Sequence, residues 1–135
     1  MSARGKARRR ALEILFEAEA RGTVATDGIT ARRESTEQVI NPYTVEIVNG
    51  VVAEQERIDE FLSSYAQGWT LDRMAAVDRA ALRIGVWEIL WNDEVPDMVA
   101  VSEAVDLVQS MSTDDSPGFV NGLLARVSEV KDTIL

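Results

Sequence analysis

Five basic side chains fall within the first ten residues, where no acidic residue occurs. Clustered arginine and lysine side chains bind phosphate groups, and arginine also stacks on unpaired bases. A cationic segment at a helix N-terminus opposes the helix dipole, so local stability does not favour it there. The cluster therefore indicates a nucleic-acid contact, with a frayed, solvated terminus as the alternative. Its members are Arg4, Lys6, Arg8, Arg9 and Arg10.

A second group with possible chemistry is the adjacent carboxylate pair Asp114 and Asp115. Two carboxylates can act as general acid and base, but adjacent side chains at the start of a helix diverge. The chain has no histidine and no cysteine, so the commonest general base and the thiol nucleophile are missing. No glycine-rich nucleotide loop occurs either. We therefore expect a protein that is not an enzyme, with no catalytic residue, no metal site and no cofactor.

The charge of the chain is divided unevenly along its length. The net charge is −9, yet the residues after the basic cluster hold nine basic and 23 acidic side chains, a balance of −14. No lysine or arginine occurs between Arg83 and Arg126, although eight acidic residues do. One end of the chain thus suits a polyanion, and the other suits a basic partner.

The length of 135 residues fits one domain with its own hydrophobic core. No run of about 18 apolar residues occurs, and glutamates interrupt the segment behind the basic cluster, so neither a membrane span nor a signal peptide is expected. The absence of cysteine suits a reducing compartment. We expect a cytoplasmic protein whose single domain, residues 1–135, has an N-terminal half at about 1–67 and a C-terminal half at about 68–135.

The basic cluster is expected to lie on a helix over about residues 4–21. Apolar side chains recur there at helical spacing, and Gly22 can end the helix in the left-handed conformation. Because the rest of that helix has an apolar stripe, it would anchor the basic side chains at one end. The apolar positions of the stripe include Leu12, Leu15 and Phe16.

Residues 23–38 give the weakest pattern: Thr26 to Gly28 is turn-like, and residues 29–39 could form a short, highly charged helix. Asn41 and Pro42 then make a favourable cap and first residue for another helix. Two stripes at helical spacing follow and indicate two helices before Gly68: Thr44 to Val52, and Ile58 to Tyr65.

Residues 77–92 are apolar nearly all round, which is typical of a helix at the centre of a bundle. The few polar side chains of this helix are therefore expected to lie at the protein surface. After a connection at Asp93 to Asp97, one more amphipathic helix is expected over the stripe from Val101 to Met111. With no alternating strand pattern, the chain is predicted to be all-α, a compact bundle of about seven helices in two packed halves. The polar positions of the central helix are Asp78, Arg79, Arg83 and Glu88.

The last helix is expected to begin with Ser116 as its cap and Pro117 as its first residue. Phe119 falls at the edge of the apolar stripe that follows, about one turn from Asp115. The two side chains can therefore face the same partner. The alternative interpretation is a well-capped helix with no other function.

Four segments of the chain together resemble the NusB family of bacterial transcription antitermination factors. They are Val77 to Arg83, Asp93 to Pro96, Glu103 to Val105, and Ser112 to Gly122. The resemblance implies an all-helical protein that binds the single-stranded boxA element of leader RNA together with NusE, a ribosomal small-subunit protein. The pair would join RNA polymerase and suppress termination in ribosomal RNA operons.

The resemblance also implies which residues bind each partner. The RNA contacts would be Arg4, Lys6, Arg8, Arg9, Tyr65 and Arg83. The contacts with NusE would be Phe16, Asp78, Asp115 and Phe119. Two alternatives are a structural homodimer and a helical RNA-binding appendage like the one that precedes some ribosomal RNA cytosine methyltransferases. The length of the chain argues against the appendage, because no methyltransferase domain follows.

Overall fold

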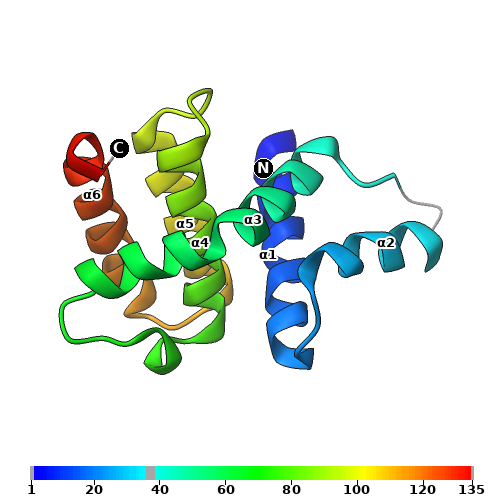
Figure 1. Ribbon diagram of the computed structural model, residues 1–135, viewed down its shortest axis with the longest axis horizontal. Helices are drawn as coiled ribbons and strands as arrows, with labels where there is room; N and C mark the ends of the chain where they lie inside the picture. Colours follow the sequence, from blue (N-terminus) through cyan, green and yellow to red (C-terminus); the bar gives the residue numbers. More distant parts are fainter. Residues whose placement is uncertain (1, 36–38, 135) are drawn as a thin grey trace. The chain divides into compact units, whose positions relative to one another are not determined.

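The computed structural model describes residues 2–35 and 39–134. All regular structure in these ranges is helical: six α-helices and one 3-10 turn (Figure 1). The expected all-α class is confirmed, with a count close to the expected seven. The chain forms two compact units, Met1–Ala53 and Glu54–Leu135, and the boundary lies inside the third helix. The single domain expected from the sequence stays a prediction.

The first unit contains α1 (Ala3–Arg21), α2 (Ala25–Ser35) and the start of α3 (Pro42–Tyr65). Ser2 caps α1, because its hydroxyl accepts a 3.0 Å hydrogen bond from the Gly5 N–H. Gly22 has φ 67° and ends α1 in the left-handed conformation, as the sequence predicted. The expected helix at the basic N-terminus is therefore present, with a cap at each end.

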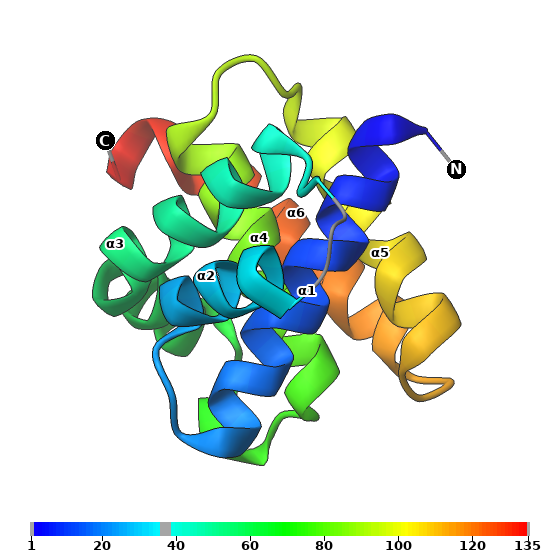
Figure 2. The same ribbon diagram turned by 90° about the vertical axis from the view of Figure 1, so that its right-hand side faces the viewer.

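Helix α2 packs against α1 (Figure 2), and the Arg32 guanidinium donates to the Glu17 carboxylate at 2.8 Å across the two helices. The turn predicted at Thr26 to Gly28 is wrong, since these residues lie inside α2. A Cβ atom on Gly28 would lie 3.3 Å from Ile14 Cγ2, so glycine allows close approach to α1. Packing across the helices thus outweighs a local preference for a turn. Part of the doubtful helix predicted over 29–39 falls at 36–38, outside the described residues.

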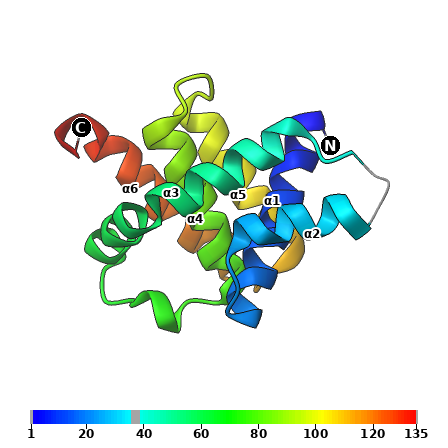
Figure 3. The same cartoon turned by 45° about the vertical axis from the view of Figure 1, so that its right-hand side comes forward.

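Helix α3 begins as predicted: the Asn41 side chain accepts from the Tyr43 N–H at 2.9 Å. The two stripes that indicated separate helices belong to this one 24-residue helix. The β-branched residues of its first half lower helix propensity, but Ile47, Val48 and Val51 are fully buried, and their burial outweighs that cost. Figure 3 shows α3 as one continuous helix.

The second unit contains the rest of α3, the 3-10 turn η1 (Leu71–Arg73), α4 (Ala76–Trp91), α5 (Asp97–Met111) and α6 (Ser116–Ile134). Helices α4, α5 and α6 pack on one another (Figure 1). Asp97 ties the start of α5 to the end of α6, since its carboxylate accepts from Ser128 Oγ at 2.7 Å and from Lys131 Nζ at 2.9 Å. The side chains that fill this core include Leu82, Ile84, Ile89, Leu107, Val108 and Leu124.

The polar side chains of α4 do not all reach the surface as expected. Glu88 is 1% exposed and Asp78 is 6% exposed, so the prediction is wrong for both. Arg79 is half-buried and donates to the carbonyl groups of Leu71 and Met74, each at 2.7 Å, which holds η1 against α4. Helical periodicity marks apolar faces but does not reveal a polar partner from another segment.

Gly85 sets the approach of α4 to α6, because an added Cβ would lie 2.6 Å from Leu124 Cδ1. Overpacking of a core costs about 1–3 kcal/mol, whereas alanine gains about 1 kcal/mol of helix propensity over glycine. We expect Gly85→Ala to lower the free energy of unfolding by about 1 kcal/mol in urea titrations. Gly122→Ala in α6 is the control, since its added Cβ would meet no atom within 4 Å beyond the neighbouring backbone of its own helix, and it should stabilise the protein. Equal effects of both changes would contradict the close approach.

Candidate nucleic-acid and partner-binding surfaces

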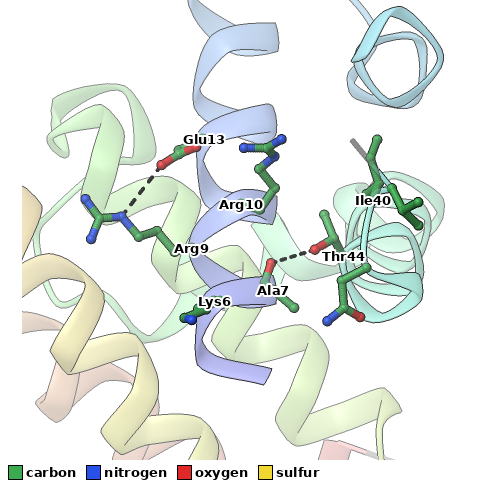
Figure 4. Close-up of a pocket in the computed structure, with 9 residues that line it drawn as sticks. Lys6, Ala7, Arg9, Arg10, Glu13, Ile40 and Thr44 are labelled. Carbon is green, nitrogen blue, oxygen red and sulfur yellow. Dashed lines mark hydrogen bonds and ion pairs between the residues drawn. The ribbon is translucent and has the colours of Figure 1, made fainter. Parts of the chain in front are cut away.

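The N-terminal turns of α1 and the segment that leads into α3 line an open groove of about 330 Å³ in the first unit. Figure 4 shows side chains that line it, with Lys6, Arg9 and Arg10 on α1. Glu13 is the acidic side chain of its lining, so the groove carries a net positive charge. We call this the basic groove; its lining is completed by Ala7, Val39, Ile40, Asn41 and Thr44.

A buried hydrogen bond fixes the two sides of the basic groove. Thr44 is 0% exposed, and its hydroxyl donates to the Ala7 carbonyl oxygen at 3.0 Å (Figure 4). Because α1 carries the cations and Thr44 belongs to the capped start of α3, this bond holds the cations at a set distance from α3. The two sides of the groove are therefore held together by a contact within the first unit.

Tyr43 supports two of the predicted cations. The Arg4 guanidinium carbon lies 4.6 Å from the centre of the Tyr43 ring and that of Arg8 lies 5.7 Å from it, both within cation–π range. Arg4 is exposed, whereas Arg8 is 3% exposed and offers a phosphate little surface. Sequence reasoning missed Tyr43, since an aromatic residue in the first turn of a helix carries no signal of this contact.

The remaining cations are more accessible. Lys6 is exposed, and Arg9 forms a 3.6 Å ion pair with Glu13 in which the two side chains are 48% and 41% exposed. Exposed ion pairs contribute about 0–1 kcal/mol, so a phosphate can replace Glu13 at low cost. Arg10 belongs to the basic cluster but not to the RNA contacts that the family resemblance implies; it is half-buried and lines the same groove.

Tyr65 and Arg83, the other predicted RNA contacts, lie in the second unit. Tyr65 is half-buried at the end of α3. Arg83 of α4 binds the Asp59 carboxylate through two hydrogen bonds, from Nε at 2.9 Å and from an η nitrogen at 3.0 Å. Its side chain is only 12% exposed. The Arg83 guanidinium thus joins α4 to α3. Its two parallel hydrogen bonds with one carboxylate favour a single geometry.

Three of the four predicted contacts for NusE lie together in the second unit. Asp78, Asp115 and Phe119 line one pocket of about 400 Å³, together with residues that sequence reasoning missed. The fourth, Phe16, is 40% exposed on α1 in the first unit. We call this the aromatic pocket; its other lining residues are Trp69, Arg73, Met74, Ala75, Thr113 and Ser116.

Ser116 has a different role from the predicted cap. The Asp115 carbonyl oxygen accepts the Phe119 N–H at 3.2 Å, so Asp115 supplies the first helical acceptor of α6. The buried Ser116 hydroxyl instead donates to Asp78 Oδ2 at 2.8 Å and accepts from the Thr113 N–H at 3.3 Å. The pairing of α6 with α4, far apart in sequence, decides where this hydroxyl points. It also explains why Asp78 is buried.

A family model described as the NusB family matches residues 5–129. The chain belongs to the NusB family. Transcription antitermination protein NusB of Paenarthrobacter aurescens (strain TC1) is 68% identical over 135 residues, which cover 100% of this chain and 99% of that protein. The family resemblance seen in the sequence is thereby confirmed, as is the expectation that the chain is not an enzyme.

Solved structures of the family show the same fold. T. maritima NusB is 25% identical, with a TM-score of 0.83 over 96% of this chain and 92% of that chain. A crystal structure of antitermination factors NusB and NusE in complex with dsRNA is also 25% identical, with a TM-score of 0.80 over 94% of this chain and 96% of that chain. Within residues 2–35 and 39–134, no helix combines the length and the apolar character that crossing a membrane requires.

Proposed function

We propose that the protein is a cytoplasmic transcription antitermination factor that binds the single-stranded boxA element of leader RNA together with NusE. The pair would then join RNA polymerase and suppress termination in ribosomal RNA operons. The observation that carries the RNA part of this proposal is the basic groove, where exposed Lys6 and Arg9 lie beside Arg10 on a fixed pair of helices. Family membership and the relative bound to NusE and dsRNA support it.

The structure of the groove suggests different roles for the predicted RNA-binding residues. Lys6 and Arg9 would bind phosphates, and Arg4, which is exposed over the Tyr43 ring, could also stack on a base. Arg8 is buried, so its role would be to hold Tyr43 in place. Two further RNA contacts in the second unit would be made by Tyr65 and Arg83.

The binding of NusE is assigned to the aromatic pocket and to Phe16. Asp115 is exposed at the pocket, and its carboxylate makes no hydrogen bond or ion pair within the described residues. A free carboxylate beside the half-buried Phe119 ring suits a basic ribosomal protein, because opposite charges guide association and a buried ring supplies contact area. Asp78 is buried, so it would not contact NusE directly. It would instead hold Ser116, at the start of α6, in place through their hydrogen bond.

Fluorescence anisotropy tests the proposal directly. A labelled boxA RNA and a scrambled RNA of equal length would be titrated with the protein alone and with NusE added. We expect the protein to prefer boxA and NusE to increase that preference at least tenfold. Weak and equal binding of both RNAs, unchanged by NusE, would reject the proposal. Light scattering on the same samples would show whether a homodimer forms instead.

A further inference from the structure

Trp69 is the most exposed aromatic side chain among the residues that the structure describes, at 52%. Its ring lies 6.0 Å from that of Phe119, centre to centre, with 57° between the planes. Exposed tryptophan leaves much apolar surface in water, and tryptophan is enriched at the centre of protein interfaces. The Trp69 and Phe119 rings thus form one continuous aromatic surface.

The backbone around Trp69 is held in one conformation. Gln67 has φ 36° and Gly68 has φ 85°, and the Trp69 N–H donates to the Ala66 carbonyl oxygen at 3.1 Å. A positive φ at a non-glycine residue costs about 1–2 kcal/mol, so the surrounding contacts must enforce it. On the other side of Trp69, η1 is held by Arg79. These contacts place the Trp69 backbone beside the pocket, where its ring contacts that of Phe119.

The charges around the aromatic pocket favour a cation. Asp115 and Asp78 both line it, and Asp78 Oδ1 is a buried oxygen with no hydrogen-bond partner in the described part of the chain. Arg73 is the pocket's cation; it is exposed, and its guanidinium forms no hydrogen bond or ion pair with a described residue. The lining of the aromatic pocket thus has two carboxylates and one guanidinium, and its net charge is negative.

We propose that Trp69 and Phe119 bind a lysine or arginine side chain of the protein partner, with its charged end at Asp115. This inference rests on the proposed binding of NusE and specifies the side chain that the pocket takes. The aliphatic part of such a side chain packs on apolar surface, while its charge is attracted to the face of an aromatic ring and to a carboxylate. An acidic side chain would be repelled by exposed Asp115 and by the negative charge of buried Asp78, and only Arg73 would attract it.

Calorimetric titration of NusE tests the role of the ring. Trp69→Ala is expected to weaken binding by about tenfold or more, because removal of an interface tryptophan commonly has effects of this size. Trp69→Phe keeps an aromatic face and should lose less than about threefold. Trp91→Phe is the matched control, since Trp91 packs on Phe61 at 6.5 Å and does not line the pocket, and it should leave affinity unchanged.

The two possible failures are distinguishable. If NusE does not bind the wild-type protein, the proposed function fails. If the wild type binds and Trp69→Ala binds equally well, only this inference is overturned. Because Trp69 is half exposed, its replacement should leave the fold intact, and a thermal melt by circular dichroism would verify this.

Two charge variants test the sign of the bound side chain. With a cation in the pocket, Asp115→Asn should weaken NusE binding about fivefold or more, and Arg73→Ala should leave it equal or tighter, because a nearby like charge is removed. The reverse pattern, with Arg73→Ala weaker and Asp115→Asn tighter, would show that the pocket takes an acidic side chain and would overturn the proposal.

Discussion

Replacement of Lys6 and Arg9 together by alanine is expected to lower affinity for boxA RNA roughly a hundredfold while NusE binding is kept. Each charge-assisted contact with a phosphate contributes about 1.5 kcal/mol, and two such contacts correspond to a factor of about 100. Both side chains are exposed on α1, so their removal leaves the buried Thr44 to Ala7 hydrogen bond and the fold in place.

Salt dependence gives the sharper readout of this double variant. For single-stranded nucleic acid, the slope of log K against log salt changes by about 0.7 for each phosphate contact. The variant should therefore bind RNA with a slope about 1.4 flatter than that of the wild type. Anisotropy titrations at several salt concentrations measure it.

The matched control removes two arginines that lie outside the basic groove, Arg33 and Arg126. Arg33 is exposed on α2. Arg126 is exposed on α6, where an η nitrogen of its guanidinium lies 3.7 Å from a carboxylate oxygen of Glu129. This control variant has the same net charge as the Lys6 and Arg9 variant. If it flattens the slope equally, total charge governs binding and the groove is not the site. An unchanged slope in the Lys6 and Arg9 variant would remove both side chains from the interface.

Ser116→Ala is expected to lower the free energy of unfolding by about 3 kcal/mol. Asp78 is 6% exposed, and in the described residues the Ser116 hydroxyl is the one hydrogen-bond donor to its carboxylate. Without that donor, a buried carboxylate is left with no partner, which costs about 1–3 kcal/mol and more for a charged group. Urea unfolding followed by circular dichroism measures the loss.

Two further variants separate this mechanism from a general effect of serine removal. Asp78→Asn combined with Ser116→Ala should be more stable than Ser116→Ala alone, because an unpaired amide costs less to bury than an unpaired carboxylate. Ser110→Ala, at an exposed position of α5, should change stability by less than about 0.5 kcal/mol. A Ser116→Ala protein as stable as the wild type would show that the Asp78 to Ser116 contact contributes little.

Local signals in the sequence were sufficient for much of the fold. Asn41 caps α3 and Gly22 ends α1 as expected, because a cap depends on one side chain and the backbone beside it. The helical spacing of apolar residues located α1, α4, α5 and α6, because the period of a helix can be recognised within one segment of the sequence. The turn-forming residue types at Thr26 to Gly28 gave a wrong prediction, because contact with α1 stabilises a helix there that local propensity disfavours.

The sequence by itself determined the helical class, the basic start of α1, the acidic character of the later chain and the family. Only the tertiary structure decided that Arg8 is buried against Tyr43, that Ser116 points to Asp78, and that Trp69 meets Phe119. Each of these contacts joins residues that lie 35 to 50 positions apart along the chain. The period of a helix shows which face is buried but not which side chain lies opposite, and that depends on how the helices pack.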